Sequence, residues 1–183
     1  MKSFFRTSLF PWILGLGILL LDQATKHWAR IRFSLPDGNP DYFKSIRVVG
    51  DWIQLRLVYN KGAAFGMKPQ SILPFLSPTL FYALFSCAAM AFLIVYYRKL
   101  SEKEYFSRFA VVLILAGALG NLTDRLRFHR VTDLIDVGIP GTYPRWPTFN
   151  VADSSVCIGM AILLLMPFFV KKSSPTSPAQ NGG

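Results

Sequence analysis

Two aspartates, Asp133 and Asp153, are the residues of this chain best suited to chemistry. Asp133 lies a few residues after one long apolar segment, and Asp153 lies in the first turn of the next, so a compact fold can bring their carboxyls together. Two neighbouring carboxylates do not both ionise easily, and one shared proton then gives one acid and one base. As a hypothesis, the charged member activates a water and the protonated member polarises a scissile carbonyl, which is the chemistry of aspartic peptide hydrolysis.

Each aspartate also has a simpler interpretation. Asn150 and Asp153 have the spacing of a capping box, in which Asp153 stabilises only the first turn of a helix. Taken alone, Asp133 could be an ordinary acidic residue in a loop. The nearby Asp136 could equally be the second catalytic carboxyl. The residues themselves therefore leave the choice between Asp133 and Asp136 open.

Further polar residues lie at the ends of apolar segments. Asp22 closes the first segment, and three polar residues close the third: Asn121, Asp124 and Arg125. In an antiparallel bundle these ends share one face with the start of the fourth segment, so the polar residues converge there. Ionisable groups at membrane depth are costly and indicate function. These residues also have a purely structural interpretation. Asp22 and Lys26 have the spacing of an ordinary ion pair on a helix surface. Asp124 and Arg125 would then form only an interfacial ion pair.

The composition predicts a membrane protein. The chain has 183 residues, 52% of them hydrophobic, and a mean hydropathy of +0.35, which is too apolar for a soluble domain of this size. Four segments approach the ~20 residues that a helix needs to cross a bilayer. They are Leu9 to Leu21 with a helical continuation to Ala29, Leu80 to Tyr97, Phe109 to Leu122 extended to Tyr105 and Leu126, and Val151 to Val170. The predicted fold class is an all-α membrane protein with a small β part, built as an antiparallel bundle of four transmembrane helices.

The first segment also has features of a secretory signal peptide, because a basic leader with Lys2 and Arg6 precedes it. No small-residue cleavage site follows, so an uncleaved first span is the better interpretation. Lys and Arg are denser in three segments, 1–8, 98–108 and 171–183, than in the two opposite loops. This asymmetry predicts cytoplasmic termini and a polar cluster on the periplasmic or outer face.

The loop after the first span predicts a small β platform. Within Asp51 to Asn60, apolar side chains alternate with the period of a strand that has one buried face, at Ile53, Leu55, Leu57 and Tyr59. The following stretch from Asn60 to Gly66 is predicted to be a tight turn or strand end, where small side chains allow close approach of another chain.

No internal repeat divides the chain, and we expect one membrane domain at 1–172, with an outer β and loop region at about 30–77. The polar segment 173–183 is predicted to be a disordered tail. The net charge of +10 is scattered over loops on both faces, which argues against nucleic acid and favours anionic lipid headgroups. His27 and His129 lack the spacing of a metal site, so no metal or cofactor is expected.

Two other classes of function remain open. A small proton-coupled transporter would use carboxylates to carry protons, but it would favour acids near the bilayer midplane rather than at one rim. A noncatalytic assembly factor would use the polar residues only to pair its helices. Cleavage of a substrate, and its loss on replacing either aspartate, would separate both classes from a peptidase.

Five blocks of sequence, in order and spread over Leu9 to Val170, resemble the lipoprotein signal peptidase family, the bacterial type II signal peptidases. They are Asp22-Gln23-Ala24-Thr25-Lys26, Asn60-Lys61-Gly62-Ala63-Ala64-Phe65, Gly120-Asn121-Leu122-Thr123-Asp124-Arg125, Val131-Thr132-Asp133-Leu134-Ile135 and Phe149-Asn150-Val151-Ala152-Asp153-Ser154. Any one block is weak, but five in register are highly specific. Two departures are mild: Leu134 stands where Phe is common, and the loop around Asp37 to Lys44 is longer than the minimum.

The resemblance implies an aspartic endopeptidase of the inner membrane that cuts prolipoproteins just before a diacylglyceryl-modified cysteine. It implies a catalytic pair at Asp133 and Asp153 and disfavours Asp136. It further implies an outer β cradle, a short periplasmic helix and, as partners, diacylglyceryl-modified prolipoproteins and membrane lipids; we expect a monomer. Eight residues of the matching blocks are expected to support the site or orient the substrate: Asp22, Lys26, Asn60, Gly62, Asn121, Asp124, Arg125 and Asn150.

Overall fold

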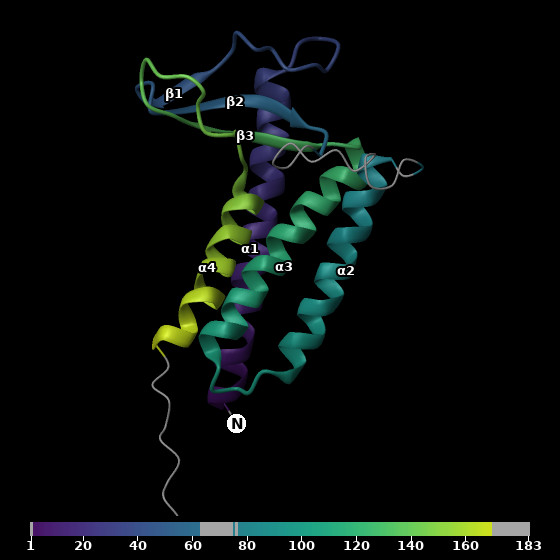
Figure 1. The fold of residues 1–183 in the computed structure, drawn as a ribbon, viewed down its shortest axis with the longest axis vertical. Coiled ribbons are helices and arrows are strands. Elements are labelled where there is room, and N and C mark those ends of the chain that lie inside the picture. Colours follow the sequence, from purple (N-terminus) through teal and green to yellow (C-terminus); the bar gives the residue numbers. More distant parts are fainter. Residues whose placement is uncertain (1, 63–74, 76, 170–183) are drawn as a thin grey trace, which may run out of the picture.

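The computed structural model describes residues 2–62, 75 and 77–169 of the chain. Four helices and three strands are formed within these residues, and the helices are α1 (Lys2–Phe33), α2 (Pro78–Lys99), α3 (Tyr105–Phe128) and α4 (Val151–Phe169). Their positions confirm the four predicted helical segments: α1, α2 and α3 extend beyond the predicted bounds, and α4 begins at Val151 as predicted. Figure 1 shows the helices running side by side, with the start of α1 and the end of α4 at the same end of the bundle.

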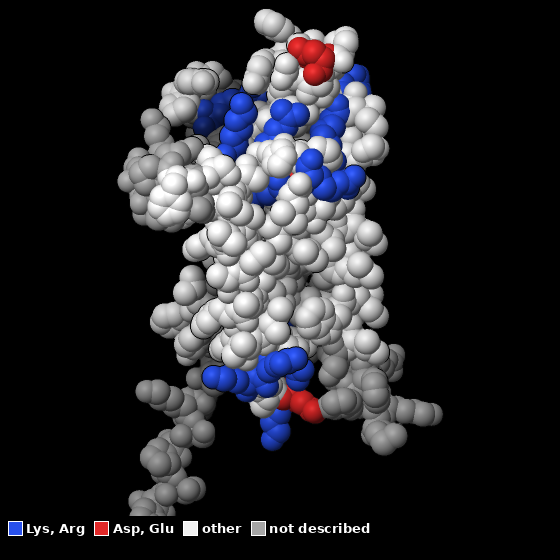
Figure 2. Space-filling model, turned by 90° about the vertical axis from the view of Figure 1, so that its right-hand side faces the viewer, with Lys and Arg blue, Asp and Glu red and all other residues white. Residues whose placement is uncertain are grey.

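Three of the helices are long and apolar enough to cross a membrane: α2, α3 and the Val151–Phe168 part of α4. Figure 2 supports this, because Lys and Arg lie at two levels of the face that it displays, separated by a broad band without charged side chains. The 32-residue α1 is not among the three, and its second half carries Asp22, Lys26 and Arg30. A membrane crossing by α1, and hence the count of four spans, stays a prediction.

A three-stranded antiparallel sheet lies at the other end of the bundle (Figure 1). Its strands are β1 (Ile46–Val49), β2 (Ile53–Asn60) and β3 (Val131–Val137), in the order β1-β2-β3. The strand predicted within Asp51 to Asn60 is therefore confirmed. In the register of β2 and β3, Val58 lies opposite Asp133.

A buried apolar cluster joins the sheet to the end of α1. It contains Ala29 and Phe33 from α1, Leu57 from β2 and Leu134 from β3, all at most 3% exposed. Because this cluster fixes β3 against the end of α1, it also fixes the height at which Asp133 stands above the bundle.

Two glycines of α3 allow the neighbouring helices to approach closely. A Cβ atom on Gly117 would lie 2.4 Å from the backbone oxygen of Ala152 in α4. A Cβ atom on Gly120 would lie 2.6 Å from Asp22 Oδ2 in α1. Both positions therefore need glycine, and α3 is the central helix that α1 and α4 pack against.

Two expected features lie wholly or partly outside the described residues. No helix is formed within 34–62 or 129–150, so a short helix on the sheet side is not seen in these stretches. The intervening segment 63–74 and the tail 173–183 are not described. The short periplasmic helix, the disordered tail and the division into one domain with a tail stay predictions.

Candidate active site

Asn150, directly before α4, joins the two candidate aspartates. Its side-chain Nδ2 donates a hydrogen bond to Asp133 Oδ1 at 2.7 Å, and its backbone N–H donates to Asp153 Oδ2 at 3.1 Å. Its Oδ1 accepts the N–H of Asp153 at 2.8 Å, which completes the capping box predicted from the sequence. The capping role of Asp153 is therefore real, and the same asparagine holds both carboxyls at one place.

Asn121 of α3 holds the second oxygen of Asp153. Its Nδ2 donates to Asp153 Oδ1 at 2.8 Å. Its own Oδ1 accepts hydrogen bonds from Lys26 Nζ at 2.8 Å and from Asn150 Nδ2 at 3.2 Å, so the amide cannot flip without losing three bonds. Both oxygens of Asp153 thus accept hydrogen bonds, which suits an ionised carboxylate because that group only accepts.

Asp22 and Lys26 form a fully buried ion pair rather than a pair on the helix surface. Lys26 Nζ lies 2.9 Å from Asp22 Oδ2 and 3.9 Å from Asp124 Oδ2, and all three side chains are at most 1% exposed. The interpretation of Asp22 and Lys26 as an ordinary surface pair is therefore wrong. The ammonium instead neutralises carboxylates from two helices and orients Asn121.

Asp124 anchors β3 to the end of α3. Its Oδ2 accepts the backbone N–H of Thr132 at 2.8 Å, and Arg30 Nη1 donates to Thr132 Oγ1 at 2.8 Å. Arg30 Nη1 also lies 3.5 Å from Asp124 Oδ1. Within the described residues Asp124 pairs with Lys26 and Arg30, so the interpretation of Asp124 as the ion-pair partner of Arg125 is wrong. The backbone immediately before Asp133 is fixed as a result.

Sequence reasoning missed Arg30 and Thr132 as members of this network. One signal was present, because Asp22, Lys26 and Arg30 follow one another at intervals of four and so lie on one face of α1. Thr132 offered no signal of its own, since its contacts use one hydroxyl and the backbone.

Asp133 is buried, with 2% of its surface exposed. Burial, followed by the negative charge of Asp153, raises the pKa of Asp133 from 3.8 to about 7, although hydrogen bonding by the Asn150 and Asn60 side chains acts in the opposite direction. Asp133 can therefore hold a proton near neutral pH, beside a carboxylate that accepts two hydrogen bonds.

Asp136, the rival of Asp133, has a different environment. Arg145 Nε donates to its Oδ1 at 2.8 Å, and Arg56 Nη1 lies 3.4 Å from its Oδ2. Neither arginine belongs to the network around Asn150. Both oxygens of Asp136 are thus occupied by cations, and the geometry favours Asp133.

Asn60 and Gly62 border the site from the end of β2. Asn60 Oδ1 accepts the N–H of Gly62 at 2.9 Å, and Gly62 has a φ of +105°, which favours glycine. The predicted turn or strand end from Asn60 to Gly66 begins here, and its residues 63–66 lie outside the described residues. In the register of β2 and β3, Asn60 lies opposite Val131, two residues before Asp133.

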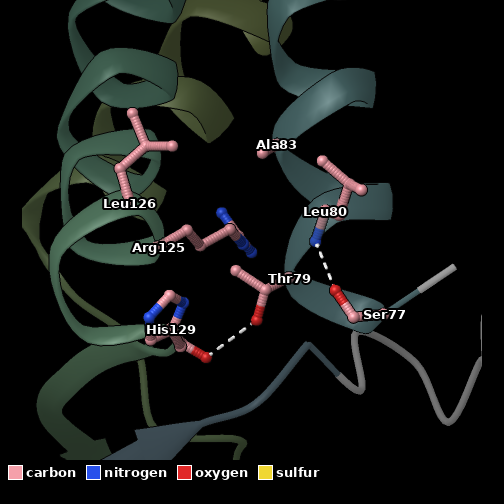
Figure 3. Close-up of a pocket in the computed structure, with 7 residues that line it drawn as sticks. All are labelled: Ser77, Thr79, Leu80, Ala83, Arg125, Leu126 and His129. Atoms are coloured by element: carbon pink, nitrogen blue, oxygen red, sulfur yellow. Dashed lines mark hydrogen bonds between the residues drawn. The ribbon is translucent and has the colours of Figure 1, made fainter.

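Arg125 lies between α3 and α2, beside the ring of Tyr82. Its guanidinium carbon is 5.3 Å from the ring centroid of Tyr82, and its charge interacts with those of Asp153 and Asp133. It points into a cavity of about 410 Å³ (Figure 3). The cavity is mostly apolar and is lined by Ser77, Thr79, Leu80, Ala83, Arg125, Leu126 and His129.

Comparison with known proteins assigns the chain to a family. The family described as signal peptidase (SPase) II matches residues 14–169. The chain belongs to the signal peptidase II family. The lipoprotein signal peptidase of Geobacter sulfurreducens is 40% identical over 148 residues, which are 81% of this chain and 84% of the relative. That of Moorella thermoacetica is 37% identical over 85% of this chain and 92% of the relative, and that of Coxiella burnetii is 34% identical over 91% and 94%.

Two solved structures share the fold of this member of the signal peptidase II family. A bacterial membrane enzyme solved at 1.9 Å has a TM-score of 0.71 and 25% identity, over 90% of this chain and 94% of that one. A second, solved at 2.3 Å, has a TM-score of 0.73 and 24% identity, over 91% and 92%. A member of this family is a peptidase, which hydrolyses peptide bonds. Membership therefore favours the peptidase over the transporter and the assembly factor.

Proposed function

We propose that this chain is an aspartic endopeptidase of the bacterial cytoplasmic membrane that removes signal peptides from prolipoproteins. It cuts just before the cysteine that carries the diacylglyceryl group. Family membership supports the peptidase and its substrate class, and the two aspartates joined by Asn150 support the chemistry. The termini are cytoplasmic and the site faces the periplasm, because Lys and Arg are denser in the sequence segments 1–8, 98–108 and 171–183 than in the two opposite loops.

The observation that carries this proposal is the pair of hydrogen bonds from Asn150 to the two aspartates, at 2.7 and 3.1 Å. Asp153, with two accepted hydrogen bonds, is the carboxylate that takes a proton from water. Asp133 is the protonated acid. The water oxygen then attacks the scissile carbonyl carbon while Asp133 gives its proton to the carbonyl oxygen.

Collapse of the resulting tetrahedral diol returns both aspartates to their starting states. The C–N bond breaks, and Asp153 gives its newly acquired proton to the leaving amine. Asp133 takes a proton back from one hydroxyl as the carboxyl group of the signal peptide forms. One water is consumed, and no metal or cofactor takes part in this proposal.

The remaining site residues hold this arrangement or meet the substrate. Asp22, Lys26, Asn121, Asp124 and Asn150 form the buried network, whereas Asn60, Gly62 and Arg125 border it. The substrate's acyl chains and signal helix lie in lipid beside the uncharged band of the bundle, and the bond to be cut reaches the sheet end (Figures 1 and 2). The single domain at 1–172 acts as a monomer.

The test is cleavage of a purified prolipoprotein in detergent, with and without its lipid, with the cut mapped by mass spectrometry. We expect cleavage of the lipidated form only, and a loss of at least about 10³-fold in kcat/KM for Asp133→Asn and for Asp153→Asn. Asp41→Asn is the matched control, because the Asp41 carboxylate pairs with the half-exposed Lys44 at 3.3 Å and accepts the Phe43 N–H at 3.1 Å, contacts that do not involve the network around Asn150. Turnover by either dyad variant, with both folded, would overturn the assignment.

A further inference from the structure

Tyr82, in the second turn of α2, has a hydroxyl that is buried and has no hydrogen-bond partner within the described residues. A buried polar group without a partner costs free energy, so folded proteins keep few of them and each needs an explanation. Neither the proposed mechanism nor the sequence motifs assign a role to this residue. A hydroxyl in this state is explained if a ligand supplies its partner.

The Tyr82 ring is held against the turn that borders the site. A Cβ atom on Gly62 would lie 2.3 Å from Tyr82 Cε2 and 2.6 Å from Cδ2, so only glycine leaves room for the ring. The N–H of Gly62 donates to Asn60, whose side chain acts on Asp133 in turn. The place of the hydroxyl is thus fixed relative to the dyad.

Arg125 lies on the face of the same ring. Its guanidinium carbon is 5.3 Å from the ring centroid, a distance typical of a cation–π contact. No carboxylate within the described residues approaches Arg125 to salt-bridge distance, although the charges of Asp133 and Asp153 act on it. Among the described residues, a hydroxyl without a hydrogen-bond partner and a guanidinium without a direct counter-ion therefore adjoin each other beside the dyad.

We infer that Tyr82 is a substrate-binding residue whose hydroxyl donates a hydrogen bond to a carbonyl oxygen of the substrate, next to Arg125. A carbonyl oxygen has two lone pairs, so it can accept from the hydroxyl and from the guanidinium together. The inference rests on the proposed function, whose substrate has such oxygens in its peptide backbone and in its acyl esters. Binding would satisfy both donors at once.

Tyr82→Phe tests this, because it removes only the hydroxyl. In the free enzyme the change removes an unsatisfied buried group, so the midpoint of thermal unfolding should rise. With lipidated substrate, kcat/KM should fall by about 10-fold, the loss of one hydrogen bond of about 1.4 kcal/mol. A hydroxyl with a purely structural role predicts lower stability instead. Tyr96→Phe is the matched control, since Tyr96 lies near the other end of α2 and is 37% exposed.

Binding can be measured apart from catalysis in the Asp133→Asn background. We expect a fluorescent lipidated substrate to bind about 10-fold more weakly to Asp133→Asn/Tyr82→Phe than to Asp133→Asn. A loss with ester-linked but not ether-linked chains assigns the acyl ester carbonyl, and an equal loss with both assigns a peptide carbonyl. Unchanged binding and kcat/KM, or a lower unfolding midpoint, would overturn the inference. If Asp133→Asn remained active, the assignment of Asp133 to the catalytic dyad would be wrong. The binding measurement on Tyr82→Phe would still test the role of Tyr82.

Discussion

Asp22 Oδ1 accepts the backbone N–H of Ala152 at 2.9 Å, although the two residues are 130 positions apart. The N–H groups in the first turn of a helix have no partner within the helix, so Asp22 of α1 caps α4 from outside. Its other oxygen pairs with Lys26 at 2.9 Å. One buried carboxylate therefore fixes the start of α4, where Asp153 lies, and compensates a buried ammonium.

Asp22→Ala should destabilise the protein strongly. The change leaves the Lys26 ammonium without its nearest counter-ion in a buried site, which costs about 3–5 kcal/mol. Asp22→Asn keeps a group that accepts the Ala152 N–H and should cost less. Thermal unfolding in detergent, monitored by circular dichroism, measures both. The double variant Asp22→Asn/Lys26→Met should be more stable than the sum of the single changes predicts, and simple additivity would contradict a coupled pair.

The raised pKa of Asp133 predicts a stability that depends on pH. The pKa is about 7 in the folded protein against 3.8 for an unperturbed carboxyl, so the folded state binds more protons between these values. The stabilising contribution of the neutral acid is therefore complete below about pH 4 and is lost as the pH rises through about 7. Asp133→Asn stays neutral throughout and should show a flatter profile. If the wild-type protein and Asp133→Asn had identical profiles of unfolding midpoint against pH, the raised pKa of Asp133 would be contradicted.

Catalytic activity should also fall as the pH rises through about 7, because Asp133 then loses the proton that it needs as the catalytic acid. If Asp133 must be protonated to polarise the scissile carbonyl, kcat/KM should fall about tenfold per pH unit above about 7. The measurement is kcat/KM for the lipidated substrate between about pH 5 and about 9, in one detergent and at constant ionic strength. The apparent values belong to the pair of aspartates rather than to either one. A rate that rises steadily to the top of this range would exclude Asp133 as the acid.

The four helices and the strand β2 could be predicted because each shows a recognisable pattern of apolar residues along the sequence. Apolar runs marked the helices, and alternation marked β2. The strand β3 was missed because side chains on both of its faces are buried, so Val131 to Leu134 gives no alternation of apolar and polar residues. The strand β1 was missed because it has four residues, all of them exposed.

The polar residues of the site could be predicted, but their partners could not. The sequence placed Asp22, Asn121 and Asp153 at one end of the bundle. It could not reveal that Lys26 is fully buried, since helix spacing alone describes a surface pair equally well. Nor could it show that Asn150 contacts both aspartates, because that contact requires β3 to lie beside the start of α4.

Asp136→Asn should lower stability and leave the chemistry intact. The carboxylate has hydrogen bonds or close contacts with Arg145 and Arg56, and neutralising it should cost about 1–3 kcal/mol. At a temperature where the variant is folded, kcat/KM should stay within about 3-fold of wild type, because Asp136 does not contact the Asn150 network. The control is Asp51→Asn, whose pair with Arg47 is half exposed and should contribute less than about 1 kcal/mol. An inactive but folded Asp136→Asn enzyme would reopen the choice between Asp133 and Asp136.

Gly117→Ala should separate α4 from α3. The new methyl group would lie 2.4 Å from the backbone oxygen of Ala152, and neither backbone can move without shifting the first turn of α4. We expect a loss of about 1–3 kcal/mol in stability, measured as a lower unfolding midpoint, and a fall in kcat because Asp153 moves with that turn. Gly17→Ala is the matched control, since nothing lies within 4 Å of its Cβ position in α1 and the change should be neutral or slightly stabilising. Equal midpoints for the two variants would show that the contact of α3 with α4 at Gly117 is looser than 2.4 Å implies.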